Sequence, residues 1–185
     1  RIVAENNKLY VAHKGGYNFG NIVSMINPAN NAITQITVGD VPNSLVENSG
    51  NLYVMCEGKP SWSGSETGGK LVKINLANNM TTSIDFAATS HPSNLVIDNG
   101  IIYYTEDADI YKMNVTASTL PTEALFSTTD QGVYGVYSFA VKNSKIYVGD
   151  AVDYSSNGKV YIYSLTGTLK KSYTVGVIPT GFYFN

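Results

Sequence analysis

The chain has 185 residues, of which 43 % are hydrophobic and 14 % charged, and its formal net charge is −2. This balance excludes a disordered chain, and with no basic run the chain lacks the electrostatic footprint of a nucleic-acid-binding protein. No apolar stretch approaches the roughly 20 residues of a membrane span, and the single cysteine excludes an internal disulfide.

Along the chain, a short strand pattern of aliphatic–Tyr–aliphatic or aromatic residues returns four times. The copies are Leu9–Val11, Leu52–Val54, Ile102–Tyr104 and Ile146–Val148. Their tyrosines lie 43, 50 and 44 residues apart (53 − 10, 103 − 53, 147 − 103). Because a fixed period of this size is the signature of a repeat architecture, the pattern indicates four tandem structural units.

Two further patterns share this period. One has the copies Pro42–Val46, Pro92–Val96, Val136–Ala140 and Pro179–Tyr183, which are 50, 44 and 43 residues apart. The other follows each tyrosine segment, and its copies are Val23–Asn27, Leu71–Asn75, Ile110–Asn114 and Val160–Ser164. Three patterns that recur in the same order therefore predict a structural repeat of 43 to 50 residues.

Each repeat divides into four short strands. In the second repeat we expect them at about Ser44–Glu47, Leu52–Cys56, Leu71–Leu76 and Thr81–Phe86, separated by Asn- and Gly-rich turns. Four strands per 43 to 50 residues is typical of a β-propeller blade. The sequence therefore predicts an all-β fold, with one propeller domain over 1–185 and blades at about 1–38, 43–87, 93–128 and 136–175.

The last pattern copy stands alone. A final strand of the type that begins each blade, the inner strand, is expected at 179–184, although each of the four blades already has one. We therefore expect four blades of a larger ring. A self-contained four-blade ring and a homodimer of two half-rings are the alternatives.

The stretch Lys8–Glu57 resembles the YncE-like, surface-layer-type propeller proteins, whose blades carry a Leu-Tyr-Val strand and a Val-Gly-x-x-Pro turn. That turn is present here as Val38–Pro42 and Val175–Pro179. The resemblance implies a seven-bladed ring, export and a place at the bacterial cell surface or in the periplasm. Some relatives capture a nutrient such as cobalamin for uptake. Four repeats cannot make that ring, and no cobalamin-contacting residues match, so the ligand is not carried over.

A binding site is expected on the face that bears the longer loops. Strands in a blade are antiparallel, so the loops between second and third strands emerge with the inter-blade connections. Long loops are expected at His13–Gly20, Gly58–Gly69 and Asp150–Gly158, and a short one at Glu106–Asp109. The candidate ligand-binding residues on this face are Tyr17, Asn18, Phe19, Lys59, Trp62, Glu66, His91, Tyr134, Asp153 and Tyr154. Such aromatic and polar groups suit a small molecule or glycan, or alternatively pack their own loops.

Motifs that suggest chemistry are incomplete. Gly64–Lys70 resembles a P-loop, but Leu71 replaces the Mg²⁺-binding Ser or Thr and a strand is expected next instead of a helix. The acidic turn Glu106–Asp109 lacks the Gly and the later Glu of an EF-hand loop. His13 and His91 are the only histidines and lie in no catalytic motif. We therefore expect no catalytic residue, metal or cofactor.

These observations favour a non-enzymatic, exported binding module that holds a small molecule, a glycan or a partner protein on the long-loop face. A protein–protein scaffold of a surface complex is the second hypothesis. A propeller hydrolase or lyase is the third, because residues from several blades can meet without leaving a motif in the sequence.

Overall fold

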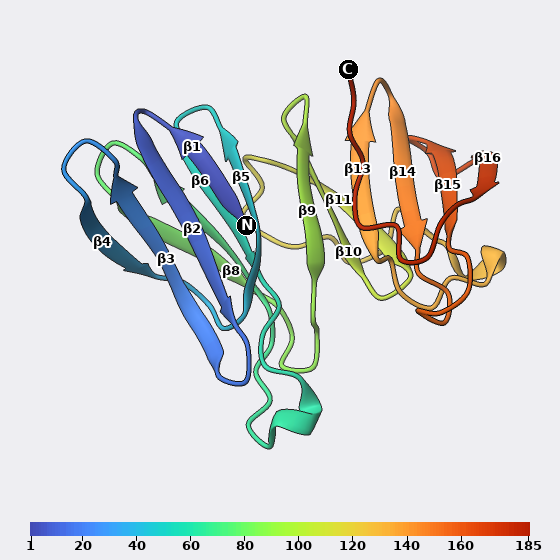
Figure 1. Cartoon of the computed structure of the whole chain (residues 1–185), viewed down its shortest axis with the longest axis horizontal. Helices are drawn as coiled ribbons and strands as arrows, with labels where there is room; N and C mark the ends of the chain where they lie inside the picture. Colours follow the sequence, from blue (N-terminus) through green and yellow to red (C-terminus); the bar gives the residue numbers. More distant parts are fainter. The chain divides into compact units, whose positions relative to one another are not determined.

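The computed structural model describes residues 1–185 as four antiparallel sheets of four strands each, with no α-helix (Figure 1). The first two sheets contain β1 (Ile2–Glu5), β2 (Lys8–Gly15), β3 (Phe19–Asn27), β4 (Ala32–Thr37), β5 (Pro42–Asn48), β6 (Asn51–Cys56), β7 (Lys70–Asn75) and β8 (Thr81–Asp85). The last two contain β9 (Ser93–Asp98), β10 (Ile101–Glu106), β11 (Asp109–Asn114), β12 (Phe126–Ser127), β13 (Ser138–Lys142), β14 (Lys145–Asp150), β15 (Lys159–Ser164) and β16 (Leu169–Thr174). The four predicted four-stranded blades are therefore confirmed.

The chain divides into two compact units. Unit 1 comprises residues 1–95 and 118–120, and unit 2 comprises 96–117 and 121–185. Unit 1 thus holds the first two blades, and unit 2 holds most of the third blade and the whole fourth. The expectation of one domain over 1–185 stays a prediction.

The first hairpin of every blade closes with the same kind of turn. Both turn residues have positive φ in each case, at Asn6-Asn7, Ser49-Gly50, Asn99-Gly100 and Asn143-Ser144. Positive φ at both central residues defines the type I′ turn, whose twist matches that of the paired strands, and Asn and Gly tolerate it best. These turns set the register of the first two strands of each blade.

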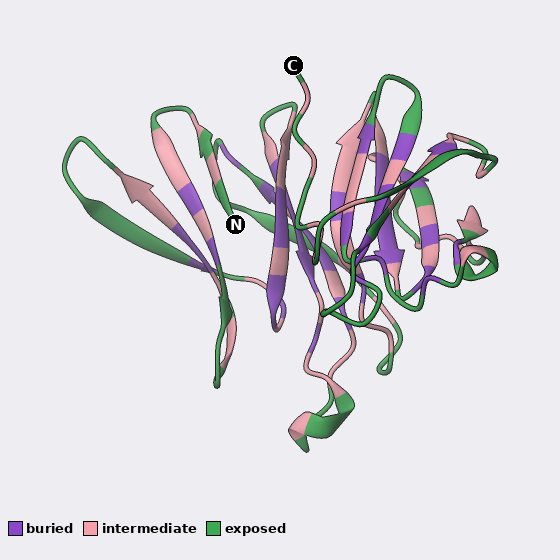
Figure 2. Cartoon of the chain, turned by 45° about the vertical axis from the view of Figure 1, so that its right-hand side comes forward, coloured by how far each residue is buried: buried purple, intermediate pink, exposed green.

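The hydrophobic core lies mainly on the second and third strands of the blades. In unit 1 the cluster includes the fully buried Tyr10, Val23, Leu52 and Ile74. In unit 2 it forms around residues such as Ile146. The fourth strands β4, β8 and β16 are mostly exposed, as the polar face of a blade's outer edge requires (Figure 2).

The predicted closing strand at 179–184 is wrong, because residues 175–185 form no strand. The segment instead docks on the fourth blade through side chains. Ser138 Oγ donates a 2.6 Å hydrogen bond to the carbonyl oxygen of Pro179. The rings of Phe182 and Phe184 lie 5.7 and 5.0 Å from that of Tyr147. A strand needs a hydrogen-bonded neighbour, and each sheet is already complete with four strands.

Candidate functional site

The first expected long loop is in fact a long hairpin. β2 and β3 stay paired as far as Gly15 and Phe19, with a bulge between His13 and Gly15. Only Gly16, Tyr17 and Asn18 remain at the tip, so the predicted loop His13–Gly20 is wrong in extent. The physical reason is that Gly15 adopts φ +85°, which allows the ladder to continue past the bulge. The tip projects Tyr17 fully into solvent.

In unit 1 the structure brings together aromatic residues from two blades. Trp62 lies on the short 3₁₀ turn η1 (Ser61–Ser63), which ends at Gly64 in the left-handed conformation. Its ring centroid is 5.8 Å from that of Phe19, with an interplanar angle of 50°. Trp62 is nevertheless 79 % exposed, and its indole N–H makes no hydrogen bond within the protein. We call Tyr17, Phe19 and Trp62 the aromatic surface.

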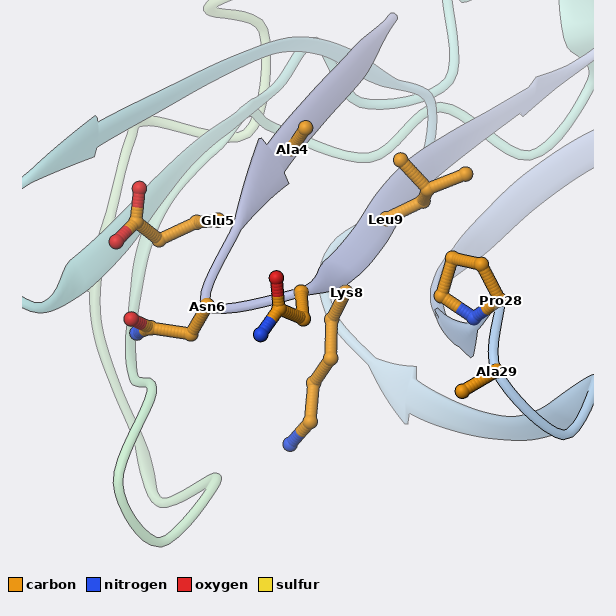
Figure 3. Close-up of a pocket in the computed structure, with 8 residues that line it drawn as sticks. Ala4, Glu5, Asn6, Lys8, Leu9, Pro28 and Ala29 are labelled. Atoms are coloured by element: carbon orange, nitrogen blue, oxygen red, sulfur yellow. The ribbon is translucent and has the colours of Figure 1, made fainter.

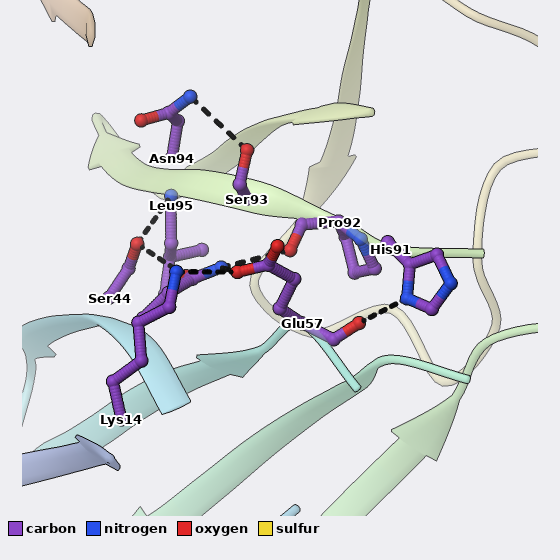
Figure 4. Close-up of polar contacts among 9 residues, drawn as sticks. Lys14, Ser44, Glu57, His91, Pro92, Ser93, Asn94 and Leu95 are labelled. Carbon is purple, nitrogen blue, oxygen red and sulfur yellow. Dashed lines mark hydrogen bonds and ion pairs between the residues drawn. The ribbon is translucent and has the colours of Figure 1, made fainter. Parts of the chain in front are cut away.

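Charged and polar side chains hold the segments on which this surface is built (Figure 4). Lys14 Nζ lies 2.9 Å from a carboxylate oxygen of Glu57, which joins the β2–β3 hairpin to the end of β6. His91 Nδ1 is 3.0 Å from the carbonyl oxygen of Glu57, and His91 Nε2 is 3.1 Å from Glu66 Oε1. Two of the predicted site residues, Glu66 and His91, are thus paired with each other.

Lys59 has a similar internal role. Its Nζ lies 3.6 Å from Asp40 Oδ2, which also accepts a 2.9 Å hydrogen bond from the Thr67 hydroxyl. The same hydroxyl accepts a hydrogen bond from the Lys59 backbone N–H at 2.9 Å. Lys59 therefore closes the base of its loop, and its charge is already partly neutralised.

Three predicted residues fall in unit 2. The rings of Tyr154 and Tyr137 meet edge to face, with centroids 5.7 Å apart. Asp153 accepts hydrogen bonds from the backbone N–H groups of Ser155 and Ser156 at 3.0 and 2.6 Å, and therefore shapes this loop. These bonds hold the pKa of the Asp153 carboxyl well below its usual range. Tyr134, highly exposed, lines a pocket of about 300 Å³ together with Asp107 and Asp109.

A pocket that the sequence did not indicate lies at the other end of the first blade. It measures about 610 Å³ and is formed where the β1–β2 turn approaches the turn after β3 (Figure 3). Its lining residues are Ala4, Glu5, Asn6, Asn7, Lys8, Leu9, Pro28 and Ala29. Asn-rich hairpin turns look alike in sequence whether or not two of them enclose a space, so no signal marked this pocket.

The two histidines occupy different settings. His13 Nε2 lies 2.9 Å from the hydroxyl of the buried Ser24, a distance at which a base activates a nucleophile. No carboxylate or carbonyl contacts the other ring nitrogen of His13, so the orienting third group of a triad is missing. The pair satisfies the hydrogen-bonding capacity of a buried hydroxyl. No group of three or more His, Cys, Asp or Glu side chains has the geometry to hold a metal ion.

Comparison with known proteins gives the fold. Neither a protein-family model nor a curated protein sequence matches the chain. A quinoprotein alcohol dehydrogenase-like protein from Bacteroides thetaiotaomicron matches with a TM-score of 0.73 and 15 % identity, over 95 % of this chain and 45 % of that one. The calcium-binding protein regucalcin from Agrobacterium tumefaciens matches with a TM-score of 0.63 and 15 % identity, over 96 % of this chain and 60 % of that one.

The extracellular domain of a hybrid two-component system from B. thetaiotaomicron also matches, with a TM-score of 0.58 and 16 % identity, over 92 % of this chain and 21 % of that one. These structural neighbours are bacterial β-propeller proteins, so the predicted propeller fold is confirmed. Identities this low show the fold alone. The chain spans between about a fifth and three fifths of the length of these neighbours. No helix in it has the length and hydropathy needed to cross a membrane.

Proposed function

We propose that this chain is a non-enzymatic binding module that captures a glycan on the aromatic surface of unit 1. The observation that carries the proposal is the exposure of Trp62 on a turn of defined geometry. The indole is 79 % exposed, yet its turn is capped by Gly64 and its ring rests against Phe19. The exposed face of the indole packs against nothing in the protein. An aromatic side chain that is exposed in this way is typical of a residue that contacts a ligand or partner.

The chemistry around the ring suits a polyhydroxylated ligand. The apolar face of a sugar packs on an aromatic ring, while its hydroxyl groups need hydrogen-bond partners. The indole N–H of Trp62, the hydroxyl of Tyr17 and the side-chain amide of Asn18 make no hydrogen bonds within the protein. They are therefore free to bond a ligand without first breaking an internal contact.

The shape also favours a glycan over a compact apolar molecule. Small apolar ligands are usually enclosed in pockets that bury most of their surface. The aromatic surface instead projects from a hairpin tip and a short turn. Two pockets of unit 1 are lined by other residues, around the Asn6-Asn7 turn and around Asp40 and Lys70.

The extracellular neighbour and the YncE-like sequence pattern support a location at the bacterial cell surface or in the periplasm for the same module. In that setting, the ligand would be a glycan met outside the cytoplasm. This location can be tested by fractionating cells and probing each fraction with an antibody against the chain.

The proposal is tested by screening the purified chain on a glycan array and measuring the hits by calorimetry. Trp62→Ala is expected to abolish binding, and Phe19→Ala to weaken it. Tyr173→Ala is the matched control, because Tyr173 is an exposed aromatic residue on the outer strand β16. Glycan binding that survives Trp62→Ala, or an array without hits, contradicts the proposal.

A protein–protein scaffold is the second candidate, favoured by the tyrosines of unit 2. Tyr134, Tyr137 and Tyr154 are exposed, and the loop after Tyr154 continues with two serines, an asparagine and a glycine. Tyrosine with Ser, Asn and Gly is also the composition of antibody paratopes. Binding to a purified surface-complex protein that is lost in Tyr154→Ala but kept in Trp62→Ala would favour this candidate.

A further inference from the structure

The ring of His91 lies between two hydrogen-bond acceptors. One is the carbonyl oxygen of Glu57, 3.0 Å from Nδ1, and the other is a carboxylate oxygen of Glu66, 3.1 Å from Nε2. A neutral imidazole has one N–H and can donate to only one of them. An ionised Glu66 has no proton to donate, and neither has the Glu57 carbonyl. The ring can therefore hydrogen-bond to both acceptors only when it carries two protons. Figure 4 shows the bond to the Glu57 carbonyl.

In the sequence, the two acceptor residues Glu57 and Glu66 lie on either side of Trp62. Glu57 follows β6 directly, and Glu66 follows the 3₁₀ turn that carries the indole. His91 belongs to the connection between β8 and β9, so a third segment of unit 1 joins both ends of the stretch 57–66. Glu66 has no other hydrogen bond or ion pair.

We propose that His91 is the positioning residue of Trp62, and that its doubly protonated ring clamps both ends of the segment 57–66. When the ring loses a proton, it keeps one contact, and the Glu66 end of the segment is released. The consequence for glycan capture rests on the proposed function, but the clamp itself does not.

Other bonds hold the base of the segment without reaching Glu66. The Thr67 backbone N–H donates to the Lys59 carbonyl oxygen at 3.1 Å, and Gly58 N–H donates to the Asp40 carbonyl oxygen at 3.0 Å. These bonds do not depend on a histidine. Release at Glu66 is therefore a local rearrangement of the turn, and the blade stays folded.

The charges around the ring favour its protonated form. Glu66 from the loop and Glu57 from the end of β6 are its carboxylate neighbours, and Lys14 from β2 pairs with Glu57. Lys59 and Asp40, the next charged residues along the loop, form an ion pair with each other. Partial desolvation lowers the pKa of His91, but the hydrogen bonds to Glu66 and Glu57 and the two carboxylate charges outweigh it, and the pKa is raised above 6.5.

The sign of the pH dependence follows. Because the folded pKa of His91 is raised, the stabilisation from the clamp is complete below about pH 6.5, the ordinary value for histidine. It is lost as the pH rises through the folded pKa. The indole of Trp62 should therefore be better ordered in mildly acidic than in alkaline solution.

Trp62 is the only tryptophan, so its indole N–H gives a single NMR cross-peak and its fluorescence reports one site. We would titrate this cross-peak and the ring nitrogens of His91 from about pH 5 to 9 without ligand. We expect a shift of the indole peak whose midpoint matches that of His91 and lies above about 6.5. In Glu66→Gln the His91 midpoint should fall, and in His91→Gln the indole shift should disappear.

His13→Gln is the matched control, because the ring of His13 hydrogen-bonds to Ser24 and to no residue of the segment 57–66, and it should leave the indole titration unchanged. An indole shift that persists in folded His91→Gln, or that is absent from the wild-type chain, overturns the proposal. If His91→Gln does not fold by circular dichroism, Glu66→Gln decides by itself. Because no ligand is used, failure of glycan binding would leave this result untouched.

Discussion

The rings of Phe19 and Trp62 lie against each other in a tilted arrangement, although the two residues are 43 positions apart in the chain (62 − 19) and belong to neighbouring blades. The ion pair between Lys14 and Glu57 has the same separation of 43. The β2–β3 hairpin of the first blade thus touches the segment after β6 of the second blade through one aromatic and one charged contact. This doubled contact fixes the β2–β3 hairpin against the Trp62 turn.

Removing the aromatic partner should loosen the indole without unfolding the blade. In Phe19→Ala we expect lower fluorescence anisotropy of Trp62, because the indole loses its aromatic neighbour. The free energy of unfolding should change by about 1 kcal/mol, the scale of one aromatic pair. An unchanged anisotropy would show that the turn alone orders the indole.

Gly68 is a position where the backbone leaves no room for a side chain. A Cβ there would lie 2.2 Å from the carbonyl oxygen of Ala87 and 2.8 Å from its carbon. Gly68→Ala should therefore destabilise the chain by about 2 kcal/mol, measured by urea denaturation. Gly135→Ala is the control, because a Cβ at Gly135 has nothing within 4 Å. Equal stability of the two variants would contradict the packing argument.

The thiol of Cys56 should not react with alkylating reagents in the folded chain. It is fully buried, and burial raises its pKa to about 12, although the Gly39 N–H donates to its sulfur at 3.2 Å. Since the thiolate is the reactive form, we expect no labelling by iodoacetamide at pH 8 and one label after denaturation. Rapid labelling of the native chain would mean that β6 opens locally.

Ser138 should anchor the C-terminal segment. Ser138→Ala removes the hydrogen bond to the Pro179 carbonyl, which should weaken docking by about 1 kcal/mol. We expect faster proteolysis within residues 176–185, followed by mass spectrometry. Ser172→Ala on the exposed strand β16 serves as control. If both variants are cleaved at the wild-type rate, the packing of Phe182 and Phe184 on Tyr147 is sufficient.

Asp153 should keep its loop ordered into strongly acidic solution. Hydrogen bonds from the Ser156 and Ser155 N–H groups lower its pKa, so its contribution is present above about pH 3.9, the ordinary value, and is lost only as the pH falls through the lower folded value. A carboxyl ¹³C titration checks this midpoint. Asp153→Ala should speed amide exchange at Ser155 and Ser156. A midpoint near the ordinary value would contradict the hydrogen bonds.

The sequence by itself determined the repeat, because a blade is a local structure. Its strands pair with their neighbours in the chain, and Asn-Gly-type turns such as Asn99-Gly100 have a direct conformational signature. Four blades, and the four strands of the second repeat to within two residues, could therefore be predicted. The hairpin at Gly15 and the missing final strand could not, since both depend on which backbone groups find a partner.

Which residues contact one another in the candidate site was decided only by the tertiary structure. Loop residues such as Trp62 and Glu66 carry no periodic pattern that relates them to Phe19 or His91. Their partners come from other blades or connections, and nothing local specifies such contacts. The sequence could place aromatic and charged residues at one end of the blades. Only the tertiary structure could pair Trp62 with Phe19 and set His91 between two acceptors, because those contacts arise when separate blades pack on a common core.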